Sequence, residues 1–98
     1  MIAHVVFFRL KKDNKEENRE RMIKDLKSLP AKIDTIVEYE VGANLSTSDK
    51  SSDICLYSKF NNEQDLEGYR IHPEHQKLLE FILAVTEEIR VVDYEVQT

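Results

Sequence analysis

The segment over residues 2–10 constrains the fold of this chain more than any other. Its residues alternate as in a β-strand, but both alternating sets are largely apolar. One set contains Ile2, His4, Val6, Phe8 and Leu10, and the other contains Ala3, Val5, Phe7 and Arg9. A strand with one face in water carries polar residues on that face. We therefore expect other structure to cover this strand on both faces.

A helix is predicted over residues 14–29. Its apolar residues recur at helical spacing and are Met22, Ile23, Leu26 and Leu29. Asn14 is a suitable residue to cap the first turn. Pro30 ends the helix because a proline disfavours helical geometry at the residue before it.

Three further strands are predicted from alternating patterns over residues 33–41, 53–60 and 89–96. The apolar face of the first of these contains Val37, Tyr39 and Val41. Gly42 follows, and we expect it to be needed there because the backbone requires room or a positive φ.

A helix in two pieces is predicted between the third and fourth strands. Asn62 is a suitable cap for the first piece, and Pro73 suits the first turn of the second piece because it has no N–H to leave unpaired. A helix that ends at His72 and restarts at Pro73 places Tyr69, His72 and His75 around one joint.

The resulting order is βαββαβ, which is the plan of a ferredoxin-like α+β fold. In this plan two helices cover one face of a four-stranded antiparallel sheet. The chain contains no repeat, linker or low-complexity segment, so residues 1–98 are expected to form a single domain.

Two helices cover only one sheet face, so the other face needs a partner. The open face would expose either Val6 and Phe8 or Val5 and Phe7, together with residues of the neighbouring strands. That is more contiguous apolar surface than a monomer usually shows. We therefore expect a homodimer with the two open faces packed together. The pattern leaves open which set of residues meets the partner.

The joint around residues 69–75 contains groups suited to acid/base chemistry. A neutral imidazole takes a proton from a carbon next to a carbonyl, and a tyrosine hydroxyl orients that carbonyl. His75 and Tyr69 supply these groups, His4 is a third catalytic candidate from the first strand, and His72 is expected to line the ligand pocket. The alternative is a structural joint, in which His72 caps a helix, His75 bonds a backbone carbonyl and Tyr69 fills space.

Composition and residue spacing argue against several other classes of protein. The formal net charge of -5 argues against nucleic-acid binding. The single cysteine, Cys55, excludes an intrachain disulfide, is expected to serve packing, and favours a reducing, cytoplasmic location. There is no secretory leader pattern and no run near the roughly 18 apolar residues of a spanning helix, so we expect no membrane association. The histidine spacing is not a zinc signature, so neither a metal nor a cofactor is expected.

Three stretches together indicate a family. They are His-Val-Val-Phe-Phe-Arg-Leu at residues 4–10, Glu-Val-Gly-Ala-Asn at 40–44, and Tyr-Arg-Ile-His-Pro-Glu-His at 69–75. With them the chain resembles the stress-responsive α/β barrel (Dabb) family over essentially its whole length. The Tyr-x-x-His-Pro-x-His segment is the most specific of the three.

The resemblance implies a dimeric α/β barrel formed by two sheets packed face to face, and it does not fix one activity. A plant polyketide cyclase that this chain resembles works without a cofactor. Its pocket tyrosine falls on Tyr69, its catalytic histidine on His75 and a further pocket histidine on His4. That cyclase has an aromatic residue where this chain has Val41, so its polyketide substrate is not carried over.

Two functions remain open at this stage. The first is a dimeric, stress-associated domain that binds a small apolar ligand and performs no chemistry. The second is a cofactor-free acid/base enzyme, such as a cyclase, isomerase or lyase, that acts on a small carbonyl or polyketide-like compound. A haem or flavin oxygenase is a weaker third option, since no residue singles it out. An enzyme should place Tyr69 and His75 in one concave, partly apolar pocket.

Overall fold

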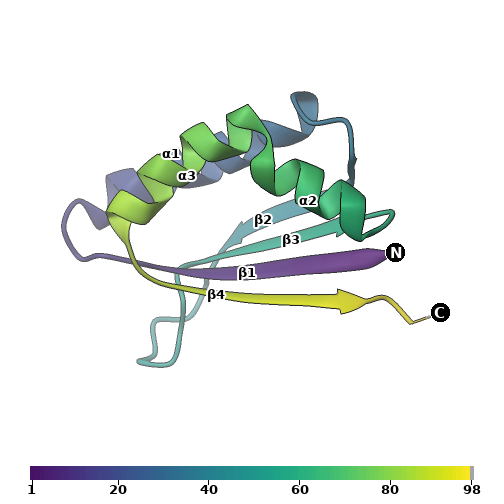
Figure 1. Cartoon of the computed structure of the whole chain (residues 1–98). Helices are drawn as coiled ribbons and strands as arrows, with labels where there is room; N and C mark the ends of the chain where they lie inside the picture. The colour runs from purple at the N-terminus through teal and green to yellow at the C-terminus, as the bar shows by residue number, and fades with distance from the viewer. Residues whose placement is uncertain (98) are drawn as a thin grey trace.

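The chain folds into one layer of helices on one face of a four-stranded sheet (Figure 1). The structure is a computed structural model that describes residues 1–97. In chain order its elements are β1 (Ile2–Leu10), α1 (Lys15–Lys27), the 3₁₀ turn η1 (Leu29–Ala31), β2 (Ile36–Ala43), β3 (Ile54–Phe60), α2 (Glu63–Ile71), α3 (Pro73–Val85) and β4 (Thr86–Glu95). This confirms the ferredoxin-like α+β plan, with the second helix divided into α2 and α3.

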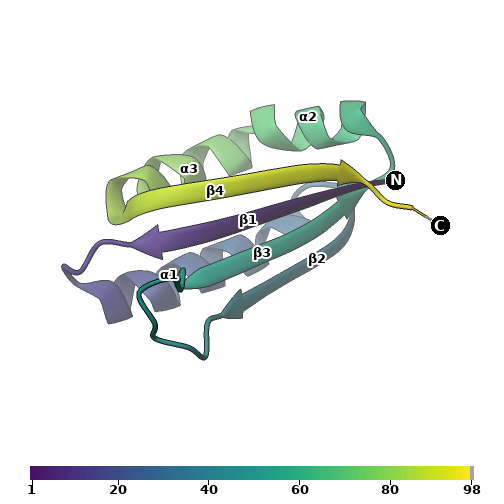
Figure 2. The ribbon, with the colours of Figure 1, turned by 90° about the horizontal axis from the view of Figure 1, so that it is seen from below.

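The sheet has the strand order β2-β3-β1-β4, and all neighbouring strands are antiparallel. The first strand therefore lies inside the sheet, paired with β3 on one side and β4 on the other. Figure 2 shows the sheet from the side away from the helices, where no helix or strand within residues 1–97 covers it. Among residues 1–97, no helix is long and apolar enough to cross a membrane.

The two faces of β1 have different environments. Val6 and Phe8 are buried beneath the helices, whereas Phe7 on the opposite face is 43% exposed. Val5, which shares that face, is only partly buried. The open face is therefore the one that carries Val5 and Phe7, which decides between the two alternatives that the sequence left open.

The core lies between this inner sheet face and the helices α1, α2 and α3, and the predicted inner side of α1 is largely confirmed. Met22 and Leu26 are buried, and Ile23 packs against the core while partly buried. The helix ends at Lys27, earlier than predicted, so Leu29 is buried from the 3₁₀ turn η1 that follows. The start of the helix differs from the expectation. Asn14 adopts a left-handed conformation with φ 54° and makes no side-chain cap hydrogen bond. Its side chain is therefore not the cap that the sequence predicted.

Strand β2 departs from the regular alternation that its sequence suggests. The register with β3 shifts between Ile36 and Glu38, so Val37 turns outward and is 45% exposed, while Tyr39 still packs against the core. Gly42 lies inside the strand without a positive φ, and a Cβ atom there would meet nothing within 4 Å. The expected backbone requirement at Gly42 is therefore wrong.

The break between α2 and α3 forms as its sequence predicts. The Asn62 side chain accepts a hydrogen bond from the Asp65 N–H at 2.8 Å, which caps α2. Pro73 is the first residue of α3. The polypeptide turns at His72, which ends one helix and caps the next, so the two helices present different residues to the sheet.

Candidate functional site

A cavity of about 360 Å³ lies between the inner sheet face and the helices α2 and α3. Most of its lining is apolar and comes from Val6, Phe8, Leu26, Leu56, Leu79, Ile82, Ile89 and Val91. Its polar lining comes from His4, Tyr69, Arg70, His75 and Gln76. This volume and this lining suit a small organic compound with a polar group at one end.

The structure brings three of the predicted site residues together at this cavity. His4 comes from β1, Tyr69 from α2 and His75 from α3. The ring centres of His4 and Tyr69 are 6.1 Å apart, and those of Tyr69 and His75 are 4.6 Å apart. The helix break at Pro73 places Tyr69 and His75 on consecutive helices whose inner sides face the same space. Their catalytic role remains a prediction.

His72 is not among the residues that line this cavity. Its Nδ1 atom accepts a hydrogen bond from the Glu74 N–H at 3.1 Å and so caps α3. The ring is therefore used for the local structure of the joint. His72 was expected to line the ligand pocket, with a helix cap as the alternative. The structure shows the helix cap.

Asp93 is a residue of this site that sequence reasoning missed. Its Oδ1 atom lies 2.5 Å from Nδ1 of His4, and its Oδ2 atom accepts a hydrogen bond from Nη2 of Arg70. His4 and Asp93 are direct partners in the antiparallel pairing of β1 with β4. The register of this pairing is the signal that would have found Asp93, and it could not be read from either strand alone.

Tyr39 was also missed, because it lies on β2, far from the joint in sequence. Its hydroxyl oxygen lies 3.0 Å from that of Tyr69. Burial raises the pKa of Tyr69 to about 12, while the hydrogen bond with Tyr39 acts in the opposite direction. Burial, followed by the neighbouring Tyr69, raises the pKa of Tyr39 further. Both hydroxyls are therefore protonated at neutral pH, and either of them can donate the hydrogen bond that joins them.

His75 is held in its neutral form. Burial is the largest cause that lowers its pKa, and His4, Arg70 and His72 lower it further, while the Arg70 carbonyl acts in the opposite direction. Even so, the buried Nδ1 atom of His75 has no hydrogen-bond partner among residues 1–97. The neutral ring always retains one nitrogen that accepts a proton.

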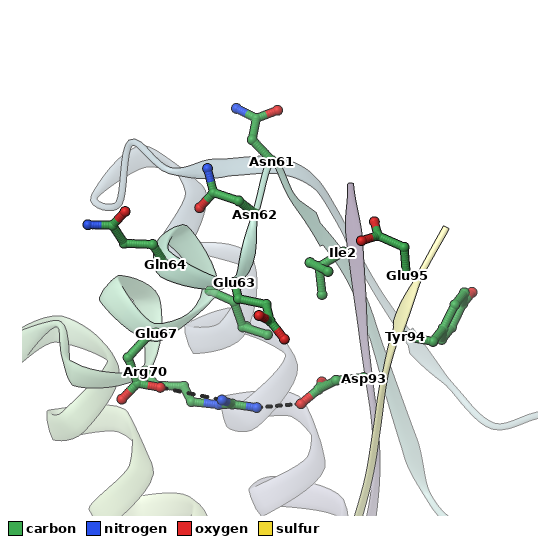
Figure 3. Close-up of a pocket in the computed structure, with 11 residues that line it drawn as sticks. Ile2, Asn61, Asn62, Glu63, Gln64, Glu67, Arg70, Asp93, Tyr94 and Glu95 are labelled. Atoms are coloured by element: carbon green, nitrogen blue, oxygen red, sulfur yellow. Dashed lines mark hydrogen bonds and ion pairs between the residues drawn. The ribbon is translucent and has the colours of Figure 1, made fainter. Parts of the chain in front are cut away.

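A second, larger cavity of about 740 Å³ lies where the start of α2 faces the ends of β1 and β4 (Figure 3). It is a groove as open to solvent as the smaller cavity, and its carboxylates are Glu63, Glu67, Asp93 and Glu95. None of the sequence-predicted site residues lines this groove. Arg70 lines both the groove and the smaller cavity, so its side chain stands between them.

Other candidate chemistry finds less support in the structure. No group of three His, Cys, Asp or Glu side chains within residues 1–97 is arranged to hold a metal ion. Cys55 lies on β3 opposite Gly42, and burial, followed by the charge of Glu40, raises the pKa of its thiol. A raised pKa disfavours the thiolate form that a cysteine nucleophile needs.

Comparison with known proteins identifies relatives along nearly the whole chain. The family described as "Stress responsive A/B Barrel Domain" matches residues 2–96. The stress-response A/B barrel domain-containing protein DABB1 of Arabidopsis thaliana is 24% identical over 98 residues, which is 96% of this chain and 46% of that protein. The chain thus spans less than half the length of this relative.

Solved structures of the same fold agree with this match. A dimeric protein of unknown function with a ferredoxin-like fold from Bacteroides fragilis is 33% identical with a TM-score of 0.87, and the match covers 97% of this chain and 95% of that one. Hydroxynitrile lyase from Passiflora edulis is 19% identical with a TM-score of 0.87, and the match covers 98% of this chain and 93% of that one. At this identity the likeness shows a shared fold. From the match over residues 2–96, this chain belongs to the stress-responsive A/B barrel (Dabb) family.

Proposed function

We propose that this protein is a cofactor-free acid/base enzyme that acts on a small, largely apolar carbonyl compound bound in the 360 Å³ cavity. The observation that carries the proposal is the position of His75 beside Tyr69. Their ring centres are 4.6 Å apart, and both side chains line a cavity with mostly apolar walls. A base and a hydroxyl donor thus meet where a compact ligand fits.

In this mechanism His75 removes a proton from the carbon next to the carbonyl group. The lowered pKa of His75 supports this role because the ring accepts a proton only when it is neutral. Negative charge then develops on the carbonyl oxygen. The Tyr69 hydroxyl donates a hydrogen bond to that oxygen, and the protonated His75 later returns the proton to the product.

The apolar walls support this assignment in a second way. Apolar walls lower the local dielectric around a bound ligand, so a single donor from Tyr69 stabilises the developing charge more than it would in bulk water. A neutral carbonyl compound also enters this space without the large desolvation cost of a carboxylate. We therefore expect ketones and β-keto compounds to bind better than acids of the same size.

Exchange of hydrogen for deuterium at the carbon next to the carbonyl tests this function without knowledge of the natural product. We expect the protein to accelerate this exchange for members of a panel of small aromatic and aliphatic ketones in D₂O, followed by proton NMR. H75N should reduce the rate by about 10²–10⁴-fold, the usual contribution of a general base. H72N is the matched control, since His72 lies outside the cavity and asparagine retains the ability to cap α3.

The same experiment separates the enzyme from a binding domain. Ketones that bind in the cavity, detected by chemical-shift changes of its methyl groups, but do not exchange in any member of the panel would identify a small-molecule-binding domain. Equal exchange rates for the wild type and H75N would contradict the role of His75.

We also propose that two copies of the chain pack through their open sheet faces. Large apolar side chains are exposed on this face, with Phe7 43%, Val92 55% and Tyr94 46% exposed. Ferredoxin-like proteins with similar structures are described as dimeric. The cavity lies on the other side of the sheet, so each copy would carry its own site.

A further inference from the structure

Arg70 connects the helix layer with the edge strand β4 beside the cavity. It lies on α2, and its Nη2 atom donates a hydrogen bond to Oδ2 of Asp93 on β4, while Nη1 lies 3.5 Å from the Glu67 carboxylate (Figure 3). The helix α2 packs on the other three strands, but not extensively on β4. The Arg70–Asp93 ion pair therefore joins α2 to β4.

The other oxygen of Asp93 contacts His4 at 2.5 Å. A carboxylate accepts hydrogen bonds and donates none, so Nδ1 of His4 must carry the hydrogen in this contact. In a neutral ring the second nitrogen, Nε2, is then an acceptor. Since Nδ1 is turned to Asp93 and the ring lines the cavity, Nε2 is the nitrogen available to a ligand.

We propose that Arg70 is a positioning residue of this site: by sharing the Asp93 carboxylate with His4, it holds the His4 ring as the neutral Nδ1–H tautomer with Nε2 presented to the cavity. The relevance of this tautomer to catalysis rests on the proposed function. The arrangement of Arg70, Asp93 and His4 rests on the contacts alone.

The positive and negative charges beside His4 balance within the Arg70–Asp93 ion pair. The titratable and charged groups that face the ring are Asp93 from β4, Arg70 and Tyr69 from α2, and His75 from α3. The guanidinium of Arg70 is always charged and balances the single negative charge of Asp93. The charge of Asp93 is therefore already balanced by Arg70, and its carboxylate acts toward His4 as a hydrogen-bond acceptor.

Nitrogen-15 NMR of histidine-labelled protein without ligand tests the proposal. In the wild type at pH 7.5 we expect the two ring nitrogens of His4 to have widely different shifts, with the hydrogen on Nδ1. The opposite tautomer, or a ring that carries hydrogen on both nitrogens at this pH, would overturn the proposal. This first result needs no variant.

R70Q then tests the part played by Arg70. Without the guanidinium, Oδ2 of Asp93 loses the hydrogen bond from Arg70 that holds the carboxylate in place. We therefore expect the His4 hydrogen to be shared between the two ring nitrogens, with nitrogen shifts closer together than in the wild type. R70K retains the charge and should stay close to the wild type. K77Q is the control, because it removes the same charge from an exposed side chain on α3. An unchanged His4 spectrum in R70Q, or an equal change in K77Q, would overturn the proposal.

This experiment fails or succeeds independently of the proposed function, since neither a ligand nor a turnover rate is measured. Absence of carbonyl exchange together with the expected R70Q shift would reject the enzyme and retain Arg70 as the residue that sets the hydrogen-bonding pattern of His4. Carbonyl exchange with an unchanged R70Q spectrum would retain the enzyme and reject the role of Arg70.

Discussion

At the scale of single residues, Tyr69 combines a structural and a proposed chemical role. It is fully buried, it lines the cavity, and its hydroxyl contacts that of Tyr39. A buried hydroxyl that loses its partner costs about 1–3 kcal/mol. The pair is therefore part of the stability of the fold as well as of the site.

A double-mutant cycle measures this pair. We expect Y69F and Y39F each to lower the free energy of unfolding by about 1–3 kcal/mol, because each leaves one buried hydroxyl unpartnered. The double variant should cost clearly less than the sum, since it leaves no hydroxyl behind. Urea denaturation provides the values. Strictly additive losses would show that the two hydroxyls do not interact.

The neutral His75 makes stability depend on pH in a defined direction. Its folded-state pKa is below the unfolded value of about 6.5. The unfolded chain therefore binds a proton first as the pH falls, so this residue has no effect well above pH 6.5 and destabilises the fold progressively below it. The effect stops growing once the pH falls below the folded-state pKa.

Urea denaturation between pH 8 and pH 5 should reveal this dependence by comparison of the wild type with H75N. The variant lacks the titrating ring, so its unfolding free energy should fall less steeply between pH 7 and pH 5. The matched H72N variant should follow the wild type. A steeper fall for H75N would mean that the pKa of His75 is raised in the fold.

At the scale of elements, the joint between α2 and α3 is encoded by local chemistry. The cap at Asn62, the end of α2 at His72 and the restart at Pro73 all follow from residues within a few positions of each other. Local rules could therefore predict the joint, and through it the meeting of Tyr69 with His75.

Other parts of the fold depend on pairing between distant strands. The outward turn of Val37 results from a register shift against β3, and the contact of His4 with Asp93 results from the register of β1 against β4. The apolar periodicity of one strand does not determine how that strand is aligned with its neighbour, so neither register could be predicted. For the same physical reason the sequence predicted three of the polar cavity residues but not the neighbouring Asp93 and Tyr39. Arg70 and Gln76 were also missed, although they lie on α2 and α3 next to the joint and depend on no strand register.

The cap at His72 provides a prediction for the joint itself. H72A removes the acceptor for the Glu74 N–H and should lower the free energy of unfolding by about 0.5–2 kcal/mol. H72N should recover most of this loss because its side-chain oxygen can cap the same N–H. Thermal unfolding followed by circular dichroism gives the comparison. An equal loss in H72A and H72N would indicate that packing of the ring, rather than its hydrogen bond, stabilises the joint.

At the scale of the whole molecule, the two faces of the sheet have separate tasks. The inner face supports the core and the cavity, and the outer face presents Phe7, Val92 and Tyr94 to solvent. The first strand is apolar on both faces for this reason. The sequence alone predicted that both faces of the sheet must pack against other structure. Only the positions of the helices show which face remains open.

A charge on the open face tests the proposed dimer. We expect F7E to sediment as a monomer, or to lose solubility, because a buried unpaired carboxylate is costly in an apolar interface. L83E is the control, since Leu83 is 59% exposed on α3, in the helix layer. A wild-type chain that sediments as a monomer, or an F7E variant that remains a dimer, would contradict an interface through this face.

The most direct test of the central claim is a crystal structure of the protein with a small ketone from the exchange panel. Our account predicts that the ketone occupies the 360 Å³ cavity, with its carbonyl oxygen in hydrogen-bond contact with the Tyr69 hydroxyl and its neighbouring carbon facing the His75 ring. A ketone bound in the groove beyond Arg70, or a ketone in the cavity whose carbonyl faces away from both residues, would contradict it.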